Sequence, residues 1–233
     1  MPAPDEASLR RLEACARQRA SEVDIEPDDT GVTITHKPLG LQFRHSLADG
    51  PMMRRARQPG QALLKACKNK QRSIRHVLDT TAGWGADGLT LASHGQSVTW
   101  LEKEPLVHAI LEYSLARLES RPENADVAGR LALKQTNAAD YLRALPRDHD
   151  FACILLDPMF PAHKSGAKAG KEMQILQALT ENQDIEACFE LALEKAINRV
   201  VVKRPLKAPV ISPRKPDLCY REKTIRYDVY LTG

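Results

Sequence analysis

Two short segments of this chain carry residues whose types and spacing could do chemistry. The first is Gly83-Trp84-Gly85-Ala86-Asp87-Gly88, a G-x-G-x-x-G pattern four residues after Asp79, which ends an apolar run. Glycines let a backbone approach a ligand closely, and the helix that follows offers free N–H groups. The second is Asp157-Pro158-Met159-Phe160-Pro161, which places hydrogen-bond acceptors beside an aromatic ring. Together they predict a nucleotide-type pocket next to a site for a planar amine.

The position of the glycines helps to decide which nucleotide-like cofactor fits. In dinucleotide enzymes the same pattern follows its strand directly. Here three residues, 80 to 82, separate Asp79 from Gly83. The Asp79 carboxylate can accept from the backbone of the turn or from an ammonium group of the ligand. This favours the positively charged S-adenosylmethionine (SAM) over NAD, with Asp79, Gly83 and Gly85 as cofactor-binding candidates, while Asp87 could simply complement the helix dipole.

Two further polar positions follow later strands. Glu102 closes the apolar run from Val98 to Leu101, where a carboxylate can accept from both ribose hydroxyls. A surface acid at a strand end would give the same pattern. Residues 136 to 140, Thr-Asn-Ala-Ala-Asp, offer polar groups where an adenine ring would lie, although such clusters also cap helices.

The segment from Asp157 to Pro161 resembles the D/N-P-P-Y/F motif of enzymes that methylate exocyclic amino groups. The Asp157 side chain or the Pro158 carbonyl can accept the N–H bonds of the amine, which aims its lone pair at a methyl donor. Phe160 can stack on a base, and the two prolines stiffen the loop. The alternative is a proline-rich turn after a buried strand.

Basic residues are clustered although the net charge is only +4. From Gly50 to Leu78 the chain has no acidic residue, and this segment contains Arg54, Arg55, Arg57, Lys65, Lys68, Lys70, Arg72 and Arg75. A second basic set comprises Lys203, Arg204, Lys207, Arg214 and Lys215. Such clusters suit a phosphate backbone, and the alternative is a solvated basic face.

From Ile74 onward, apolar runs alternate with helical patterns, which predicts a mostly parallel, doubly wound α/β sheet. The expected strands are Ile74–Leu78, Ser97–Leu101, Arg130–Lys134, Phe151–Leu156, Arg199–Lys203 and a final pair within Lys223–Leu231. The expected helices are Gly85–His94, Pro105–Leu118, Ala139–Ala144, Lys171–Ala178 and Ile185–Ala196.

The chain before this alternation predicts a small separate unit of residues 1–50. It combines a helix over Glu6–Ala20 with a hairpin of Gly31–His36 and Leu39–Arg44. Residues 51–72 form a basic connection with a bridging helix over Gln61–Asn69, and residues 73–233 form the main domain.

Composition fits a globular protein: 42% of the 233 residues are hydrophobic. No apolar run approaches the roughly 20 residues of a membrane span. Because the first six residues are acidic and lack an apolar signal core, we expect a cytoplasmic protein. The five scattered cysteines indicate neither a metal site nor a disulfide framework. With no helix showing a spare apolar stripe, we expect a monomer.

Several segments together resemble the RsmJ family, bacterial guanine-N2 methyltransferases of small-subunit ribosomal RNA. The resemblance covers residues 31 to 233 and is most specific in D-P-M-F-P and the following K-S and K-E-M. The matching segments are Asp79–Gly85, Leu101-Glu102, Leu156–Pro161, Lys164-Ser165, Lys171–Met173, Val200–Pro205 and Arg226–Tyr230.

This resemblance implies a class I SAM-dependent methyltransferase fold: a Rossmann-like, doubly wound sheet with a small N-terminal α+β unit. It implies SAM as methyl donor and, as substrate, the N2 amine of a guanine near the 3′ end of 16S rRNA, free or in the small ribosomal subunit. Carried over by position, the SAM contacts fall at Ala86, Asp87, Glu102, Lys103, Ala139, Asp140 and Asp157.

The resulting hypothesis gives each candidate a role. Asp157 and Pro158 bind the amine, Phe160 stacks on the base and Glu102 fixes the ribose. Phosphates are held by Arg54, Arg55, Arg57, Lys164, Lys168, Lys171, Lys203 and Arg204. Two alternatives remain: a methyltransferase of another amine or amide, such as adenine or a protein glutamine, and a non-catalytic RNA-binding factor of ribosome assembly.

Overall fold

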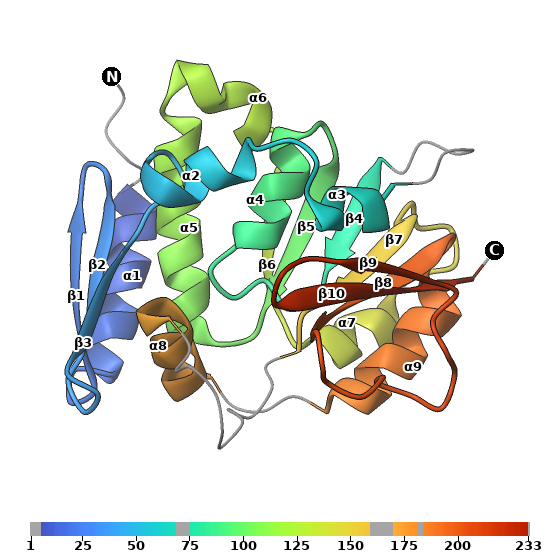
Figure 1. Ribbon diagram of the computed structural model, residues 1–233. Helices are drawn as coiled ribbons and strands as arrows, with labels where there is room; N and C mark the ends of the chain where they lie inside the picture. The colour runs from blue at the N-terminus through green and yellow to red at the C-terminus, as the bar shows by residue number, and fades with distance from the viewer. Residues whose placement is uncertain (1–5, 69–74, 159–169, 181–183, 233) are drawn as a thin grey trace.

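A computed structural model gives the fold, and it describes residues 6–68, 75–158, 170–180 and 184–232. Figure 1 shows a large central sheet with helices on both faces and a small three-stranded sheet at one side. Of the predicted site residues, Phe160, Lys164 and Lys168 lie outside the described residues.

The central sheet has seven strands in the order β6-β5-β4-β7-β8-β10-β9. The five strands from β6 to β8 are parallel to one another, and β10 is antiparallel to both of its neighbours. The predicted doubly wound, mostly parallel sheet is therefore confirmed. The strands are β4 (His76–Asp79), β5 (Ser97–Glu102), β6 (Leu131–Gln135), β7 (Cys153–Leu156), β8 (Arg199–Pro205), β9 (Leu218–Arg221) and β10 (Ile225–Leu231).

Alternation along the strands sends successive side chains to opposite faces of the sheet. One face packs on α4 (Ala86–Ser93) and α5 (Pro105–Glu119) and contributes Val77, Trp100, Leu155 and Val201 to one buried cluster. The other face packs on α7 (Ala138–Ala144) and α9 (Ile185–Lys195), and its cluster includes Leu78, Leu101, Ile154 and Val202. A residue two positions after Val77, Trp100, Leu155 or Val201 therefore also points to the face of the sheet that α4 covers.

The N-terminal unit consists of α1 (Glu6–Gln18) and the antiparallel strands β1 (Val23–Asp28), β2 (Gly31–His36) and β3 (Leu41–His45). The predicted helix and hairpin are present, and β1 is an additional strand. Leu12, Val32 and Ile34 share a buried cluster with Ile110 of α5, so this unit packs directly on the main domain.

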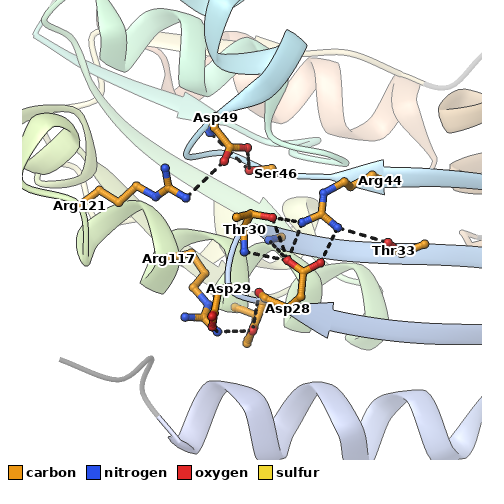
Figure 2. Close-up of polar contacts among 11 residues, drawn as sticks. Asp28, Asp29, Thr30, Thr33, Arg44, Ser46, Asp49, Arg117 and Arg121 are labelled. Atoms are coloured by element: carbon orange, nitrogen blue, oxygen red, sulfur yellow. Dashed lines mark hydrogen bonds and ion pairs between the residues drawn. The ribbon is translucent and has the colours of Figure 1, made fainter. Parts of the chain in front are cut away.

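Arginine–aspartate pairs reinforce that packing, as Figure 2 shows. Within the N-terminal unit, Arg44 of β3 donates to Asp28 with an Nη1–Oδ2 distance of 2.8 Å, and Arg117 of α5 donates to Asp29 at 3.4 Å. Arg121, just beyond α5, donates to Asp49 at 3.2 Å, and Tyr113 of α5 donates its hydroxyl to the Asp28 carbonyl at 3.0 Å. These contacts fix the β1–β2 turn and the segment after β3 on α5.

Two sequence predictions differ from the structure. The segment after Gly50 forms two short helices, α2 (Gly50–Ala56) and α3 (Ala62–Ala66), where one bridging helix was expected. Pro59 and Gly60 interrupt the chain between them, since neither continues a helix easily. The residues from Lys223 onward provide only β10, and its partner β9 begins earlier, at Leu218.

Three short helical elements complete the described chain: the 3-10 turn η1 (Pro122–Asn124), α6 (Ala125–Ala128) and α8 (Lys171–Leu179), which packs against β3. Among the residues that the structure describes, no helix is both long and apolar enough to cross a bilayer.

Gly88 allows α4 to pack closely on the sheet. A Cβ at this position would lie 1.9 Å from Nε1 of Trp100 in β5. We expect Gly88→Ala to lower the free energy of unfolding by about 2 kcal/mol or more, because the indole is fully buried and cannot move aside. Urea unfolding measures the change.

The matched control is Gly170→Ala, where the added Cβ would lie 3.5 Å from the nearest atom, an oxygen of the Glu172 side chain. Equal losses of stability in the two variants would contradict the proposed clash with Trp100.

Candidate active site at the carboxyl edge of the sheet

Charged residues lie at or near the carboxyl ends of four neighbouring parallel strands, at the same edge of the sheet. Across β5, β4, β7 and β8 these are Glu102, Asp79, Asp157 and Lys203. The register pairs Asp79 with Leu155 and Leu156 with Val202, so Asp157 and Lys203 lie one residue beyond matched positions. All four side chains fall on the α4 face, where the N-terminus of α4 begins. The edge therefore gathers an excess of acids over bases.

Asp79 is the most deeply buried of these acids, with 2% of its surface exposed. Its Oδ1 accepts from the backbone N–H of Thr81 at 3.1 Å. Burial raises the pKa of Asp79 to about 8, and the carboxylates of Asp87 and Asp157 add to the rise. Without a bound cation, the Asp79 carboxyl is therefore largely protonated at neutral pH.

Lys203 lies inside this cluster, although the sequence analysis assigned it to RNA phosphates. Its Nζ donates to Oδ2 of Asp157 at 2.7 Å and to Oδ2 of Asp87 at 2.8 Å. Burial lowers the pKa of Lys203, but the attraction of Asp157 and Asp87 outweighs it, so the pKa lies above its ordinary value. Burial likewise raises the pKa of Asp157, and the Lys203 ammonium opposes that rise. The lysine thus joins the end of β7 to the start of α4.

Two threonines join the glycine loop to the segment after β7. Thr80 donates its hydroxyl to the Leu155 carbonyl at 2.9 Å. The Thr81 hydroxyl oxygen accepts from the backbone N–H of Asp157 at 2.6 Å. The two motifs that the sequence separates by more than seventy residues therefore form one hydrogen-bonded unit.

Glu102 connects the end of β5 to the glycine loop. Its Oε2 accepts from the N–H of Gly83 at 3.1 Å, and its Oε1 accepts from the N–H of Glu104 at 2.8 Å. Burial raises the pKa of Glu102, while the backbone N–H groups of Glu104, Gly83 and Lys103 oppose the rise. Because a carboxylate has about four acceptor sites, these three backbone donors leave Glu102 the capacity to accept one further hydrogen bond.

Trp84, to which the sequence analysis gave no role, anchors the glycine loop to elements outside it. Its ring packs on Phe43 of β3 at a centroid distance of 4.8 Å, and its Nε1 donates to the Glu172 carbonyl of α8 at 2.9 Å. Its own carbonyl lies 3.0 Å from Nε2 of His45. Burial lowers the pKa of His45 to about 4, so the neutral ring donates through Nε2 and accepts from Ser114 at Nδ1. The N-terminal unit and α8 thereby brace the loop.

Asn137 acts as an N-cap, the alternative that its sequence context left open. Its Oδ1 accepts from the N–H groups of Ala139 at 2.9 Å and Asp140 at 3.4 Å. The surface beside this cap is hollowed by about 210 Å³. The hollow is lined by Asn137, Ala138, Ala139, Asp140, Arg143, Asp184 and Cys188. Ala139 and Asp140 thus border a cavity, and their contact with an adenine ring stays a prediction.

The predicted phosphate-binding residues that the structure describes lie on different elements and differ in exposure. Arg54 and Arg55 of α2 and Lys171 of α8 are exposed. Arg57 donates to Asn124 at 2.8 Å, beside the end of α5 that lies away from the acidic edge. Arg204 is buried and donates to the Pro209 carbonyl, so the structure does not present it as a surface cation.

The edge fits a cationic ligand. Asp79, Asp87 and Asp157 interact with one another electrostatically, and Lys203 is the one ammonium group among their contacts that the structure describes. Buried charge without a partner is costly, so a positive group placed here would be strongly favoured. Gly85, at φ +76°, and Gly83, at φ +52°, shape the loop beside it without side chains.

Comparisons with known proteins agree with this arrangement. A family model described as a putative SAM-dependent methyltransferase matches residues 31–232. The chain is 43% identical over 172 residues to ribosomal RNA small subunit methyltransferase J of Pseudomonas paraeruginosa, covering 73% of this chain and 66%, just under two thirds, of that protein. It is 38% identical over 218 residues to the protein of the same name from Chromohalobacter salexigens, covering 91% of this chain and 85% of that protein.

A solved structure is similar along the whole chain. The SAM-dependent methyltransferase NGO1261 of Neisseria gonorrhoeae superposes with a TM-score of 0.70 at 25% identity, covering 100% of this chain and 94% of that one.

The raised pKa of Asp79 predicts how stability depends on pH. The folded ligand-free protein keeps the Asp79 proton up to about pH 8, whereas the unfolded chain loses it near the ordinary value of 3.8. Asp79 therefore makes folding less favourable as the pH rises between these values. We expect the stability of Asp79→Asn, relative to wild type, to increase by about 1 kcal/mol per pH unit between roughly pH 5 and 8.

Urea unfolding at several pH values measures this difference. The same change at Asp126, whose side chain is 94% exposed, is the control. A difference curve for Asp79→Asn that runs parallel to the control curve would contradict the prediction.

Proposed function

The chain belongs to the family of SAM-dependent methyltransferases that includes ribosomal RNA small subunit methyltransferase J, and on that premise we propose that it methylates the N2 amine of a guanine in 16S rRNA. The observation that carries the proposal is the position of Asp157. Its carboxylate lies at the strand end next to Asp79, and one of its oxygens is already held by Lys203.

The acidic edge and the glycine loop would hold SAM. The Asp79 carboxylate would accept from the ammonium group, and Glu102 would accept from a ribose hydroxyl with its remaining acceptor site. When bound, SAM supplies a methyl group on a positively charged sulfur. The exposed Ala86 and the Asp87 backbone begin the adjacent helix, and Lys103 follows Glu102, so these proposed contacts border the same loop.

Asp157 and the Pro158 carbonyl would position the amine. Oδ2 of Asp157 is bound to Lys203, and in this proposal Oδ1 accepts an N–H of the substrate. That hydrogen bond fixes the direction of the nitrogen lone pair, and positioning of this kind can supply much of the rate enhancement. SAM would supply the methyl group to this nitrogen, and Asp157 or water would accept the proton that the methylated amine loses. In this proposal Phe160 stacks on the base.

RNA as substrate is supported by the names of the relatives and by exposed basic residues. Arg54 and Arg55 are exposed on α2, in the acid-free segment, and Lys171 is exposed at the start of α8. In the proposal, Lys164 and Lys168 add positive charge between Asp157 and α8. Such residues bind phosphates without reading sequence.

Transfer of labelled methyl groups from SAM tests the proposed function. The substrates are small ribosomal subunits and naked 16S rRNA from cells that lack this gene, with tRNA and bulk protein beside them. We expect label in 16S rRNA, recovered as N2-methylguanosine. Label only in tRNA or protein would assign another amine, and no label together with no SAM binding would favour a non-catalytic RNA-binding factor.

The role of Asp157 can be tested by removing its carboxylate. We expect Asp157→Ala to lower the rate of methyl transfer by roughly a hundredfold or more, because the amine loses its acceptor, while SAM affinity changes only a fewfold. Single-turnover transfer and calorimetric SAM binding measure the two effects. Asp126→Ala, at an exposed acid of α6, is the control, and undiminished turnover in Asp157→Ala would remove Asp157 from the mechanism.

The contribution of α2 to RNA binding can be measured from the salt dependence of the RNA binding constant. We expect Arg54→Gln with Arg55→Gln to weaken RNA binding and to reduce the slope of log K against log salt by up to about 2 units. Filter binding over a salt series measures it. The control replaces Arg10 and Arg17, exposed arginines of α1, and equal slopes in the two double variants would argue against phosphate contacts at α2.

A further inference from the structure

Lys203 makes a second ion pair, with Asp87, which has no role in the proposed reaction. Its ammonium group contacts Asp157, which directly follows β7, and Asp87, the second residue of α4. The side chains of Lys203, Asp87 and Asp157 are 20%, 18% and 29% exposed, so water only partly screens these pairs. One cation therefore joins the helix of the glycine loop to the proposed amine acceptor.

The surroundings of Lys203 limit where its side chain can go. Tyr227 of β10 lies directly opposite in the antiparallel register and is 3% exposed. Val201, two residues earlier on the same face, is fully buried. The lysine stem thus runs along a packed face toward the two carboxylates. A phosphate of a bound RNA would have to compete with both of them for the ammonium group.

We infer that Lys203 is a positioning residue: it holds Asp157 on the cofactor helix through Asp87, so that a single oxygen of Asp157 faces the substrate amine. The inference rests on the proposed function for the identity of the amine, and on the two ion pairs for the link itself. It follows that Asp87 and Asp157 share the positive charge of Lys203. Each carboxylate therefore weakens the electrostatic stabilisation that Lys203 provides to the other.

The sharing of one charge makes opposite predictions for two variants. In Lys203→Met, Asp157 loses its counterion, so its carboxyl should titrate at higher pH than in wild type. In Asp87→Asn, Asp157 no longer shares the Lys203 ammonium group with Asp87 and is no longer repelled by the Asp87 carboxylate. The Asp157 carboxyl should therefore titrate at lower pH than in wild type. Each change should be about 1 pH unit or more, given charges within hydrogen-bond distance. Among the residues that the structure describes, the other titratable groups that interact with Lys203 are Asp79 of β4 and Tyr227 of β10.

The test is a pH titration of protein carrying ¹³C-labelled aspartate carboxyls, followed by NMR, with the Asp157 signal assigned from Asp157→Asn. Lys203→Arg is included because it keeps the charge and should restore most of the wild-type titration. Where Lys203→Met does not fold, Asp87→Asn, which is nearly isosteric, carries the test. An Asp157 signal that titrates at the same pH in wild type and in the folded variants would overturn the inference.

The acid limb of single-turnover methyl transfer, measured at saturating SAM, provides the second readout. We expect it to move up in pH for Lys203→Met and down for Asp87→Asn, following the NMR titration. A merely structural role would lower the rate without moving the limb, and that result would also overturn the inference. Shifted NMR titrations in a protein that does not methylate rRNA would retain the link between Lys203 and Asp157 and would refute only the proposed substrate.

Discussion

The structure of the site depends on the burial of several carboxylates at one edge of the sheet with Lys203 among them. Charge buried without a partner is expensive, and this chain reduces the cost in three ways. Lys203 pairs with Asp157 and Asp87, backbone N–H groups donate to Glu102, and the pKa of Asp79 is raised to about 8, so that this carboxyl stays protonated. What remains is an acidic edge of the sheet that suits a positively charged cofactor.

The rest of the fold holds this edge in place. Gly88 brings α4 against Trp100, which sets the helix N-terminus beside the strand ends. Trp84 is held by β3 and α8, and Thr81 binds the backbone of Asp157. The N-terminal unit therefore contributes to the site without supplying a residue to the acidic cluster. Through the hydrogen bond from Trp84 to the Glu172 carbonyl, α8 supports the glycine loop, and in the sequence α8 follows the segment that carries the D-P-M-F-P motif.

The sequence predicted the sheet and its polar edge because strand ends carry a local signal: an apolar run that stops at an acid. It could not predict the partners of Lys203, since Asp87 and Asp157 lie on other elements and a lysine after three valines gives no sign of what it meets. β1 was missed because Asp24, Glu26 and Pro27 obscure its alternation, and β9 because it is a short edge strand with three exposed residues. These are tertiary effects without a local pattern.

The electrostatic account is tested most directly by calorimetry of SAM binding at pH 7 in buffers of different ionisation enthalpy. A cation bound against Asp79 should expel its proton, so the account predicts release of nearly one proton per SAM, with a much smaller release in Asp79→Asn. A binding heat that is independent of the buffer would contradict the account, because it would mean that SAM binds without changing the charge of the buried acids.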